Sequence, residues 1–266
     1  MELIAEAFQY EIRSAVARLT LSSPNSGNLL TVSLVEHLSQ GLKQAEADDS
    51  CRVIVLQAEG EDFCKGLNLE AAFARGDRVD TAIFRKFLDC ITLISNSTKP
   101  VIAFVEGNVT GGGVCLVAAC DVVIASEYAV FMLPEAIVGM IPAIVTPFLL
   151  RRMTLGRVKY MTLSTRGIPA SEAQVFGLVD EVAVDGMAYT LTRQLQRLFR
   201  SSPHALAESK RYFDRLQAEE LNQQLEIALD QITSWLEQPD VVGGIRAFAE
   251  GFSPPWFQKY RGDKNV

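Results

Sequence analysis

Three consecutive glycines, Gly111 to Gly113, stand directly before a run of apolar residues that ends at Asp121. Because glycine has no Cβ, its backbone N–H groups can come close to a ligand. The apolar residues that follow are expected to form a short buried helix, and the N-terminus of such a helix carries partial positive charge. The start of this helix is therefore a candidate site for stabilising an oxygen anion.

A lone carboxylate, Glu135, follows this segment. It lies between two apolar stretches, residues 131–134 and 136–139. Desolvation in such surroundings raises the pKa of a carboxyl group toward the range in which it serves as a general acid or base. An anion-binding helix start together with an isolated carboxylate predicts enolate chemistry.

The segments on either side alternate between strand-like and helix-like patterns. Residues 9–21 are rich in alternating apolar side chains and end in a polar turn, which predicts a first β unit. Thr31 is a candidate N-cap for a helix whose apolar residues recur at helical spacing. Residues 53–58 and 99–105 are nearly continuous apolar runs, as strands covered on both faces show. Strand, helix and strand therefore repeat, and the predicted fold class is α/β.

The chain length of 266 residues favours one domain with a C-terminal appendage. We expect an α/β core over residues 1–200 and a C-terminal helical oligomerisation region over residues 201–266. Pro203 and Pro239 punctuate the helices predicted there. The tail of this region, residues 244–251, is expected to pack across a neighbouring subunit.

Composition argues against several classes of function. Hydrophobic residues make up 48% of the chain and charged residues 21%, and no apolar run has the length of a membrane span. The net charge of -7 argues against nucleic acid as the main partner. The first six residues carry acidic side chains where a secretory signal would carry basic ones, so a cytoplasmic protein is expected.

Cysteine and histidine usage argues against disulfides and metal. The five cysteines are odd in number and show no C-x-x-C spacing, which favours reduced thiols. The two histidines, His37 and His204, are far apart in the sequence and have no second candidate ligand nearby. No metal site is expected.

Five segments in the same order resemble the crotonase (enoyl-CoA hydratase/isomerase) superfamily, and the resemblance covers essentially the whole chain. This resemblance implies a crotonase-like ββα spiral core followed by a C-terminal helical trimerisation region. It also implies a homotrimer or a hexamer built from two trimers. The segments are residues 62–69, 107–121, 134–135 with 139–142, 173–182 and 244–248.

The resemblance also implies roles for individual residues. In the family a thioester carbonyl lies between two backbone N–H groups, and the matching residues here are Leu67 and Gly112. Donors that are fixed in advance need no reorganisation as charge develops on oxygen, and one such donor contributes about 3–4 kcal/mol. A Cβ at position 112 is expected to block the approach of the carbonyl. Glu135 matches the catalytic carboxylate, and the implied substrate-binding residues are Lys65, Gly66, Asn68, Gly111 and Cys115.

Two positions depart from the family pattern. Typical hydratases carry a second glutamate that helps to position water, and Cys115 stands at its place. Flanked by Val114 and Leu116, Cys115 is expected to be an inert packing residue rather than a nucleophile. Asn68 stands where the family usually has aspartate, and a hydrogen-bonding role in shaping the loop is expected for it. Hydration by two carboxylates is therefore in doubt.

One branch of the superfamily resembles this chain further. Residues 140–152 and 159–165 are similar to the dehydratase of polyketide β-branching cassettes, which converts 3-hydroxy-3-methylglutaryl on an acyl carrier protein into the 3-methylglutaconyl thioester. The companion decarboxylase of these cassettes lacks the carboxylate that matches Glu135, so its presence favours the dehydratase. The resemblance implies no cofactor other than the phosphopantetheine of a carrier protein or CoA that carries the substrate.

Basic residues are expected near the mouth of the site, where they would meet the phosphates of a pantetheine arm or an acidic carrier protein. A solvated helical face explains the arginines among them about as well. Other readings stay open: a catabolic enoyl-CoA hydratase or isomerase acting on free CoA esters, and a non-catalytic scaffold of crotonase fold. Glu135 could also be a buried structural residue paired with an arginine. The basic residues are Lys65, Arg75, Arg78, Arg151 and Arg152.

Overall fold

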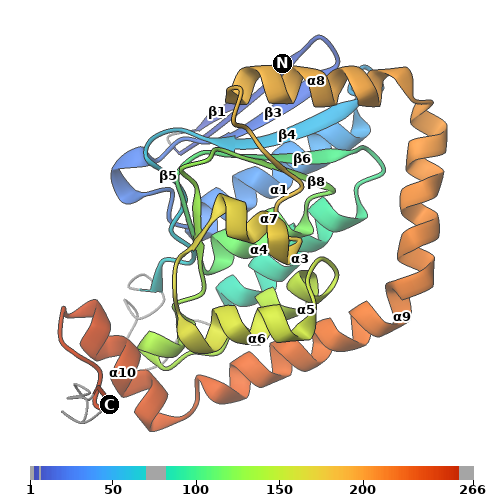
Figure 1. The fold of residues 1–266 in the computed structure, drawn as a ribbon. Helices are drawn as coiled ribbons and strands as arrows, with labels where there is room; N and C mark the ends of the chain where they lie inside the picture. The colour runs from blue at the N-terminus through green and yellow to red at the C-terminus, as the bar shows by residue number, and fades with distance from the viewer. Residues whose placement is uncertain (1–2, 6, 70–81, 258–266) are drawn as a thin grey trace.

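The computed structural model describes residues 3–5, 7–69 and 82–257, and Figure 1 shows their arrangement. Two sheets and a set of helices make up this part of the chain, as the α/β prediction requires. The strands are β1 Leu3–Ala5, β2 Phe8–Arg13, β3 Val16–Leu21, β4 Val53–Ala58, β5 Asp62–Cys64, β6 Val101–Val105, β7 Asn108–Thr110, β8 Val122–Ala125, β9 Val130–Met132, β10 Ile168–Pro169 and β11 Glu181–Val182.

Helices follow most of the predicted positions. The N-cap prediction is confirmed, because the side chain of Thr31 accepts a hydrogen bond from Leu34 N–H at the start of α1. The helices are η1 Pro24–Ser26, α1 Val32–Ala47, α3 Ala82–Asn96, α4 Gly112–Ala119, η2 Glu135–Val138, α5 Val145–Leu150, α6 Leu155–Ser164, α7 Ala170–Phe176, α8 Met187–Arg200, α9 Pro203–Trp235 and α10 Pro239–Ala249.

The larger sheet has the strand order β1-β2-β3-β4-β6-β8-β11 within the described residues. Its first three strands are antiparallel, and the strands from β3 to β11 are parallel. Parallel neighbours require a crossover connection, which α1, α3 and α4 supply. The predicted strand–helix–strand repeat is confirmed.

Successive side chains of the central strands point to opposite faces of this sheet and are buried on both. In β4, Ile54 and Leu56 belong to the main core beneath α1 and α3. Val53 and Val55 belong to a smaller apolar cluster on the other face, which α8 covers. Figure 1 shows the sheet between α8 and the group α1, α3 and α4. This double coverage explains why the strands are continuous apolar runs in the sequence.

The smaller sheet positions three loops at one edge. Its strand order is β10-β9-β7-β5, and β5, β7 and β9 are parallel. The carboxyl ends of parallel strands meet at the same edge, so the segments after Cys64, Thr110 and Met132 emerge together. Gly111 N–H donates to Met132 O at 2.9 Å and ties two of these segments to each other. The predicted site residues follow these strand ends.

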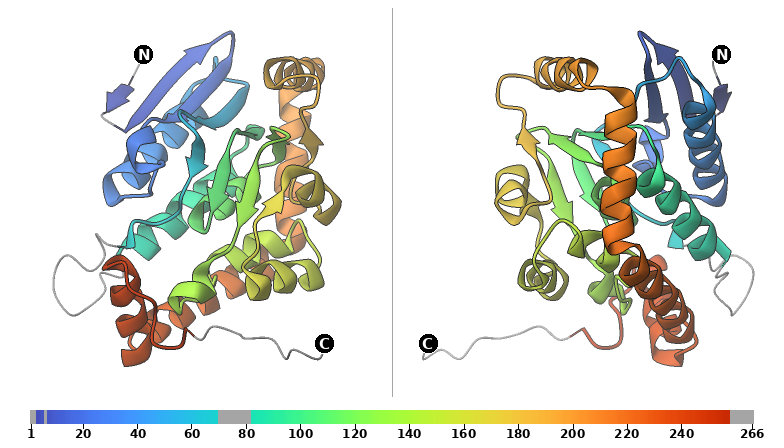
Figure 2. Two further views of the ribbon diagram at one scale, coloured as in Figure 1. Left: turned by 60° about the vertical axis from the view of Figure 1, so that its left-hand side comes forward. Right: turned by 90° about the vertical axis from the view of Figure 1, so that its right-hand side faces the viewer.

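The C-terminal helices pack against the main core of the same chain. α9 runs from the end of α8 to α10, and Figure 2 shows its course along one side of the molecule. Leu229, Ile232 and Ile245 are buried in the main core, and α10 packs against η2 of the same chain. These contacts lie within one chain, and the packing of residues 244–251 across a neighbouring subunit stays a prediction. No described helix combines the length and the apolar character that crossing a membrane needs.

Gly107 offers a test of how tightly the two sheets meet. Its φ is +78°, and a Cβ there would lie 1.8 Å from Glu61 O. We expect Gly107→Ala to lower the free energy of unfolding by more than about 1–2 kcal/mol, since a left-handed φ alone costs that much for alanine. The matched control is Gly156→Ala in α6, where a Cβ meets nothing within 4 Å. Denaturant unfolding of both variants measures their free energies of unfolding, and equal values would contradict a close contact between Gly107 and Glu61 O.

Candidate active site

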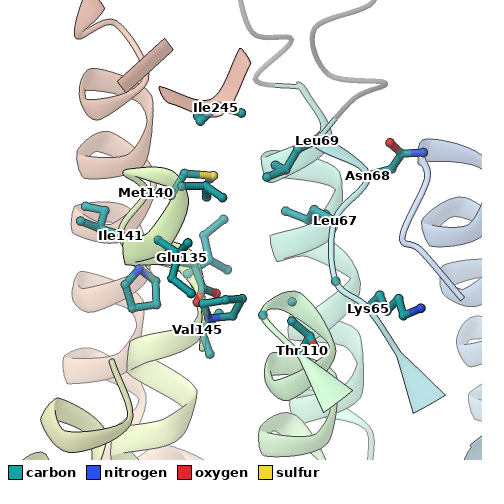
Figure 3. A pocket seen from close by; sticks show the side chains of 18 of the residues that line it. Lys65, Leu67, Asn68, Leu69, Thr110, Glu135, Met140, Ile141, Val145 and Ile245 are labelled. Atoms are coloured by element: carbon teal, nitrogen blue, oxygen red, sulfur yellow. The ribbon is translucent and has the colours of Figure 1, made fainter. Parts of the chain in front are cut away.

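A cavity of about 560 Å³ lies at the edge where the three loops emerge. Its lining is mostly apolar, with side chains from η2, the segment before α5, α3 and α10. In Figure 3, Glu135 lies on one wall, and Leu67 and Thr110 lie on the other. The cavity brings together seven of the eight predicted site residues: Lys65, Gly66, Leu67, Asn68, Gly111, Gly112 and Glu135.

The backbone N–H of Leu67 is directed away from α1. Leu67 forms a parallel bridge with Leu30, in which Leu30 N–H donates to Gly66 O at 2.8 Å and Asn68 N–H donates to Leu30 O at 3.1 Å. Successive peptide groups of an extended chain point in opposite directions. Leu67 N–H therefore points to the side opposite Leu30, which is the side of the cavity.

Gly112 is the first residue of α4, so its N–H has no partner within the helix. The loop after β5 comes close to this amide: a Cβ built on Gly66 would lie 3.2 Å from Gly112 N. Within the described residues neither Leu67 N–H nor Gly112 N–H donates to a backbone acceptor. Two free donors thus lie next to each other at the helix start, where the helix dipole adds partial positive charge.

The glycines at this contact differ in how little space a Cβ would have. A Cβ at Gly112 would meet the side chains of Leu30, Phe87 and Leu67 at 3.2–3.6 Å, so packing already restricts this position, and obstruction of the carbonyl stays a prediction. The tighter positions are Gly66 and Gly113. Gly66 has a φ of +86°, and a Cβ on Gly113 would lie 2.6 Å from Cys64 O. These two glycines allow the loop and the helix to approach.

Glu135 opens η2, three residues after the end of β9. Its Oε1 would lie 3.2 Å from a Cβ on Gly111, which places the carboxyl group against the glycine segment. Its Oε2 is buried and has no hydrogen-bond partner among the described residues. Burial raises the pKa of Glu135 from 4.5 to about 7. No arginine of the described residues pairs with it, so the alternative of a structural ion pair is wrong for this part of the chain.

Cys115 does not line the cavity. It is fully buried one turn inside α4, where its Sγ lies 3.7 Å from Ile144 O. Burial raises the pKa of this thiol far above its ordinary value, and the nearby Glu135 raises it further. Cys115 therefore stays a neutral packing residue. Of the cavity residues that the structure describes, Glu135 alone carries a carboxylate.

Lys65 and Asn68 lie at the cavity but turn away from the space between Glu135 and Leu67 (Figure 3). The ammonium group of Lys65 pairs with Asp62 at 3.0 Å and is about half exposed. Among the described residues no group of three or more His, Cys, Asp and Glu side chains is arranged to hold a metal ion.

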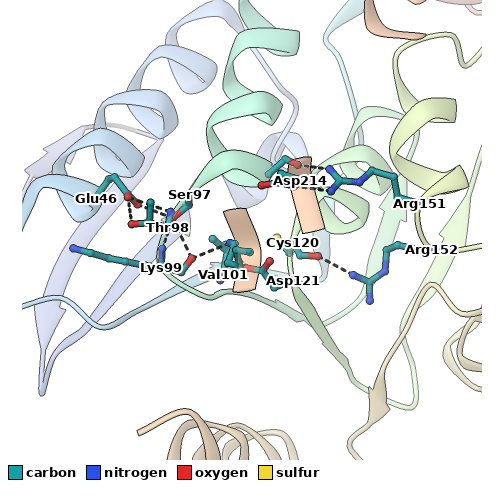
Figure 4. Close-up of polar contacts among 12 residues, drawn as sticks. Glu46, Ser97, Thr98, Lys99, Val101, Cys120, Asp121, Arg151, Arg152 and Asp214 are labelled. Carbon is teal, nitrogen blue, oxygen red and sulfur yellow. Dashed lines mark hydrogen bonds and ion pairs between the residues drawn. The ribbon is translucent and has the colours of Figure 1, made fainter. Parts of the chain in front are cut away.

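The prediction that Arg151 and Arg152 lie at the mouth of the site is wrong. Arg151 donates to Ser95 Oγ and pairs with Asp214 on α9 at 2.9 Å. Arg152 donates to Cys120 O at 2.7 Å (Figure 4). Both guanidinium groups hold helices together, because their positions after α5 face the core and not the cavity. Arg75 and Arg78 lie outside the described residues.

Sequence reasoning missed the contribution of α10. Ile245, Phe248 and Ala249 line the cavity from a helix that was assigned to subunit contacts. Their spacing of three and four residues indicated one apolar helix face. Nothing in that spacing showed which surface the face covers. Thr110, the last residue of β7, is a further lining residue that the sequence analysis did not select.

Comparisons with known proteins agree with this geometry. The family model for enoyl-CoA hydratase/isomerase matches residues 11–259. The bacillaene synthase dehydratase PksH of Bacillus subtilis is 29% identical over 260 residues, covering 96% of this chain and 99% of that protein. The predicted resemblance to the superfamily and to a polyketide dehydratase is confirmed.

Solved structures show the same fold. An enoyl-CoA hydratase from Mycobacterium avium superposes with a TM-score of 0.85 at 30% identity, over 96% of this chain and 100% of that chain. A Bacillus subtilis chain designated a candidate polyketide biosynthesis enoyl-CoA hydratase (pksH) superposes with a TM-score of 0.86 at 26% identity, over 94% of this chain and 100% of that chain. The chain belongs to the enoyl-CoA hydratase/isomerase family and has the crotonase fold.

Proposed function

We propose that this protein removes water from the 3-hydroxy-3-methylglutaryl thioester of an acyl carrier protein and releases the 3-methylglutaconyl thioester. One observation carries the proposal: Glu135, the single described carboxylate of the cavity, has a buried oxygen without a partner among the described residues and lies against Gly111, next to the free amide of Gly112. The similarity to a protein named as a dehydratase of bacillaene synthase supports it.

The proposed mechanism begins with the thioester carbonyl between Leu67 N–H and Gly112 N–H. Both donors stabilise negative charge on the carbonyl oxygen, which makes the α-proton acidic enough for Glu135 to remove. The α-carbon then carries the electron pair of an enolate. As this pair forms the new double bond, the bond from the β-carbon to oxygen breaks. Protonated Glu135 gives its proton to the departing hydroxyl, and one water leaves, so a single carboxylate serves both steps.

We propose that phosphopantetheine, on a carrier protein or on CoA, is the only carrier group and that no metal takes part. Lys65 is the described cavity residue with a positive charge, and its half-exposed ammonium group is the candidate contact for a phosphate of the arm. A homotrimer or hexamer remains our proposal for the assembly. Tyr212, Phe213 and Leu216 lie exposed along α9 and favour self-association of the C-terminal region.

A second candidate is an enoyl-CoA hydratase or isomerase that acts on free CoA esters. The mostly apolar lining favours it, because a neutral acyl chain is desolvated at lower cost than the free carboxylate of 3-hydroxy-3-methylglutaryl. A non-catalytic scaffold is disfavoured. A buried carboxyl oxygen without a partner among the described residues lowers stability, and a scaffold would gain nothing by keeping it.

Intact-mass analysis of the carrier protein tests the dehydratase. We expect the 3-hydroxy-3-methylglutaryl carrier protein to lose one water with the wild type and to stay unchanged with Glu135→Gln, since glutamine can neither remove nor return the proton. Glu127→Gln, the same change at an exposed position, is the control and should match the wild type. If the wild type leaves this substrate intact but hydrates or isomerises short enoyl-CoA esters, the second candidate replaces the first.

The pH profile tests the ionisation of Glu135. Its pKa of about 7 means that the carboxylate needed as a base is mostly protonated at lower pH. We expect kcat/KM for dehydration to fall about tenfold per pH unit below about 7, because this ratio reports the ionisation of the free enzyme. Initial rates between pH 5 and pH 9 measure it, and a flat profile across pH 7 would contradict the assignment.

The same shift predicts the stability of the variant. The folded protein favours neutral Glu135, so its ionisation destabilises the fold as the pH rises from 4.5 through about 7. Glu135→Gln should therefore unfold at a temperature equal to or above that of the wild type at pH 8. A lower unfolding temperature would show that the ionised carboxylate has a stabilising partner.

A further inference from the structure

The only two tryptophans of the chain bond to the turn that carries Glu135. Trp235, the last residue of α9, donates its indole N–H to Gly139 O at 2.8 Å. Trp256, which follows α10, donates its indole N–H to Ile137 O at 3.3 Å. Two side chains from the C-terminal region therefore reach the same short turn, η2 and its C-cap Gly139, immediately after the proposed acid and base.

The carbonyl groups that accept the indole N–H groups have no hydrogen-bond partner within the turn itself. η2 is a single 3-10 turn, whose last carbonyl groups have no partner within the helix. Within it, Ile137 N–H donates to Pro134 O at 2.8 Å, and Met140 N–H donates to Glu135 O at 2.8 Å. Gly139 N–H donates to Ala136 O at 3.2 Å, and the two indole N–H groups donate to the carbonyls of Ile137 and Gly139. A turn of this length is held mainly by such outside contacts, because one turn of helix is only marginally stable alone.

The ring of Trp256 rests on two glycines that come from different segments. A Cβ on Gly244 of α10 would lie 1.8 Å from the ring, and a Cβ on Gly139 would lie 2.4 Å from it. Gly139 also ends η2 with a φ of +79°, a conformation that favours glycine. The ring therefore fills a slot that exists only because both positions lack a side chain, and it joins α10 to the turn.

We propose that Trp235 and Trp256 are positioning residues that hold the η2 turn so that Glu135 faces the two amides. This inference rests on the proposed role of Glu135 as acid and base. Glu135 Oε2 has no hydrogen-bond partner among the described residues, so none of them fixes the direction of that oxygen. The backbone that bears it is fixed instead, by indole bonds to two carbonyls within four residues of it. A displacement of about 1 Å at such a group lowers the rate strongly.

Kinetics of conservative variants test the proposal. Trp235→Phe and Trp256→Phe each remove one N–H and keep an aromatic ring. We expect kcat to fall about fivefold to tenfold while KM stays within about twofold, on any thioester that the wild type turns over. The control is Phe252→Leu, an exposed aromatic residue of the same segment, which should change neither. An unchanged kcat with a raised KM would show that the tryptophans affect only substrate binding and would overturn the proposal.

Hydrogen–deuterium exchange gives a readout that needs no substrate. We expect the amides of residues 135–140 to exchange faster in both Trp→Phe variants than in the wild type, with the central strands unchanged. Equal exchange in this peptide would overturn the proposal even if the kinetics change. If the wild type dehydrates no thioester, the proposed function fails, yet the exchange result still decides whether the indoles hold the turn.

Adjacent glycines of α10 provide a matched pair. Gly244→Ala places a methyl group where the Trp256 ring lies, whereas Gly243→Ala meets nothing within 4 Å. We expect Gly244→Ala to reproduce the loss of kcat and the faster exchange seen with Trp256→Phe, and Gly243→Ala to leave both as in the wild type. Identical behaviour of the two alanine variants would contradict the role assigned to the slot.

Discussion

The approach of two backbone segments, closer than any side chain at the contact would allow, underlies the whole site. The loop after β5 meets the start of α4 at Gly66 and Gly113, where a Cβ would come within 2.9 Å of a backbone oxygen. This contact sets the amides of Leu67 and Gly112 side by side at a helix N-terminus. Parallel pairing of β5, β7 and β9 then delivers Glu135 to the same edge.

Desolvation connects this geometry to the chemistry. A mostly apolar cavity removes water from Glu135 and raises its pKa to about 7, so both its ionised and its neutral form are accessible near neutral pH. The same surroundings strengthen the interaction of the two amides with an oxygen anion, since few solvent dipoles compete. Because Oε2 of Glu135 has no partner among the described residues, the direction of the carboxylate depends on the backbone that bears it. The C-terminal tryptophans bond to the turn that bears this carboxylate and so link a peripheral region to the proposed acid and base.

Local sequence signals predicted most of the fold and the centre of the site. The strands β4 and β6 are apolar runs because both faces of their sheet are covered, and Thr31 caps α1 through a bond to a residue three positions away. Glu135 stood out as the one polar residue in an apolar stretch. Such signals depend on residues that are close in the sequence, so they can be recognised without knowledge of tertiary contacts.

The errors concern partners that are far apart in the sequence. Arg151 is held by Asp214, and α10 packs against η2 of its own chain. Neither pairing leaves a local signal in the sequence. The sequence analysis singled out Gly112 and did not identify the close backbone contacts of Gly66 and Gly113, because only the packed structure shows where a Cβ would point. The charge of Arg151 and the apolar face of α10 each indicated that a contact exists, but not which residues form the other side of it.

The most direct test of the account is the infrared spectrum of an isotope-labelled thioester carbonyl bound to Glu135→Gln, which holds the substrate without turning it over. Two amide donors withdraw electrons from the carbonyl, so its stretching band should move to lower frequency than that of the same thioester in water. A band at the frequency seen in water, or at a higher one, would contradict the placement of the carbonyl between Leu67 N–H and Gly112 N–H.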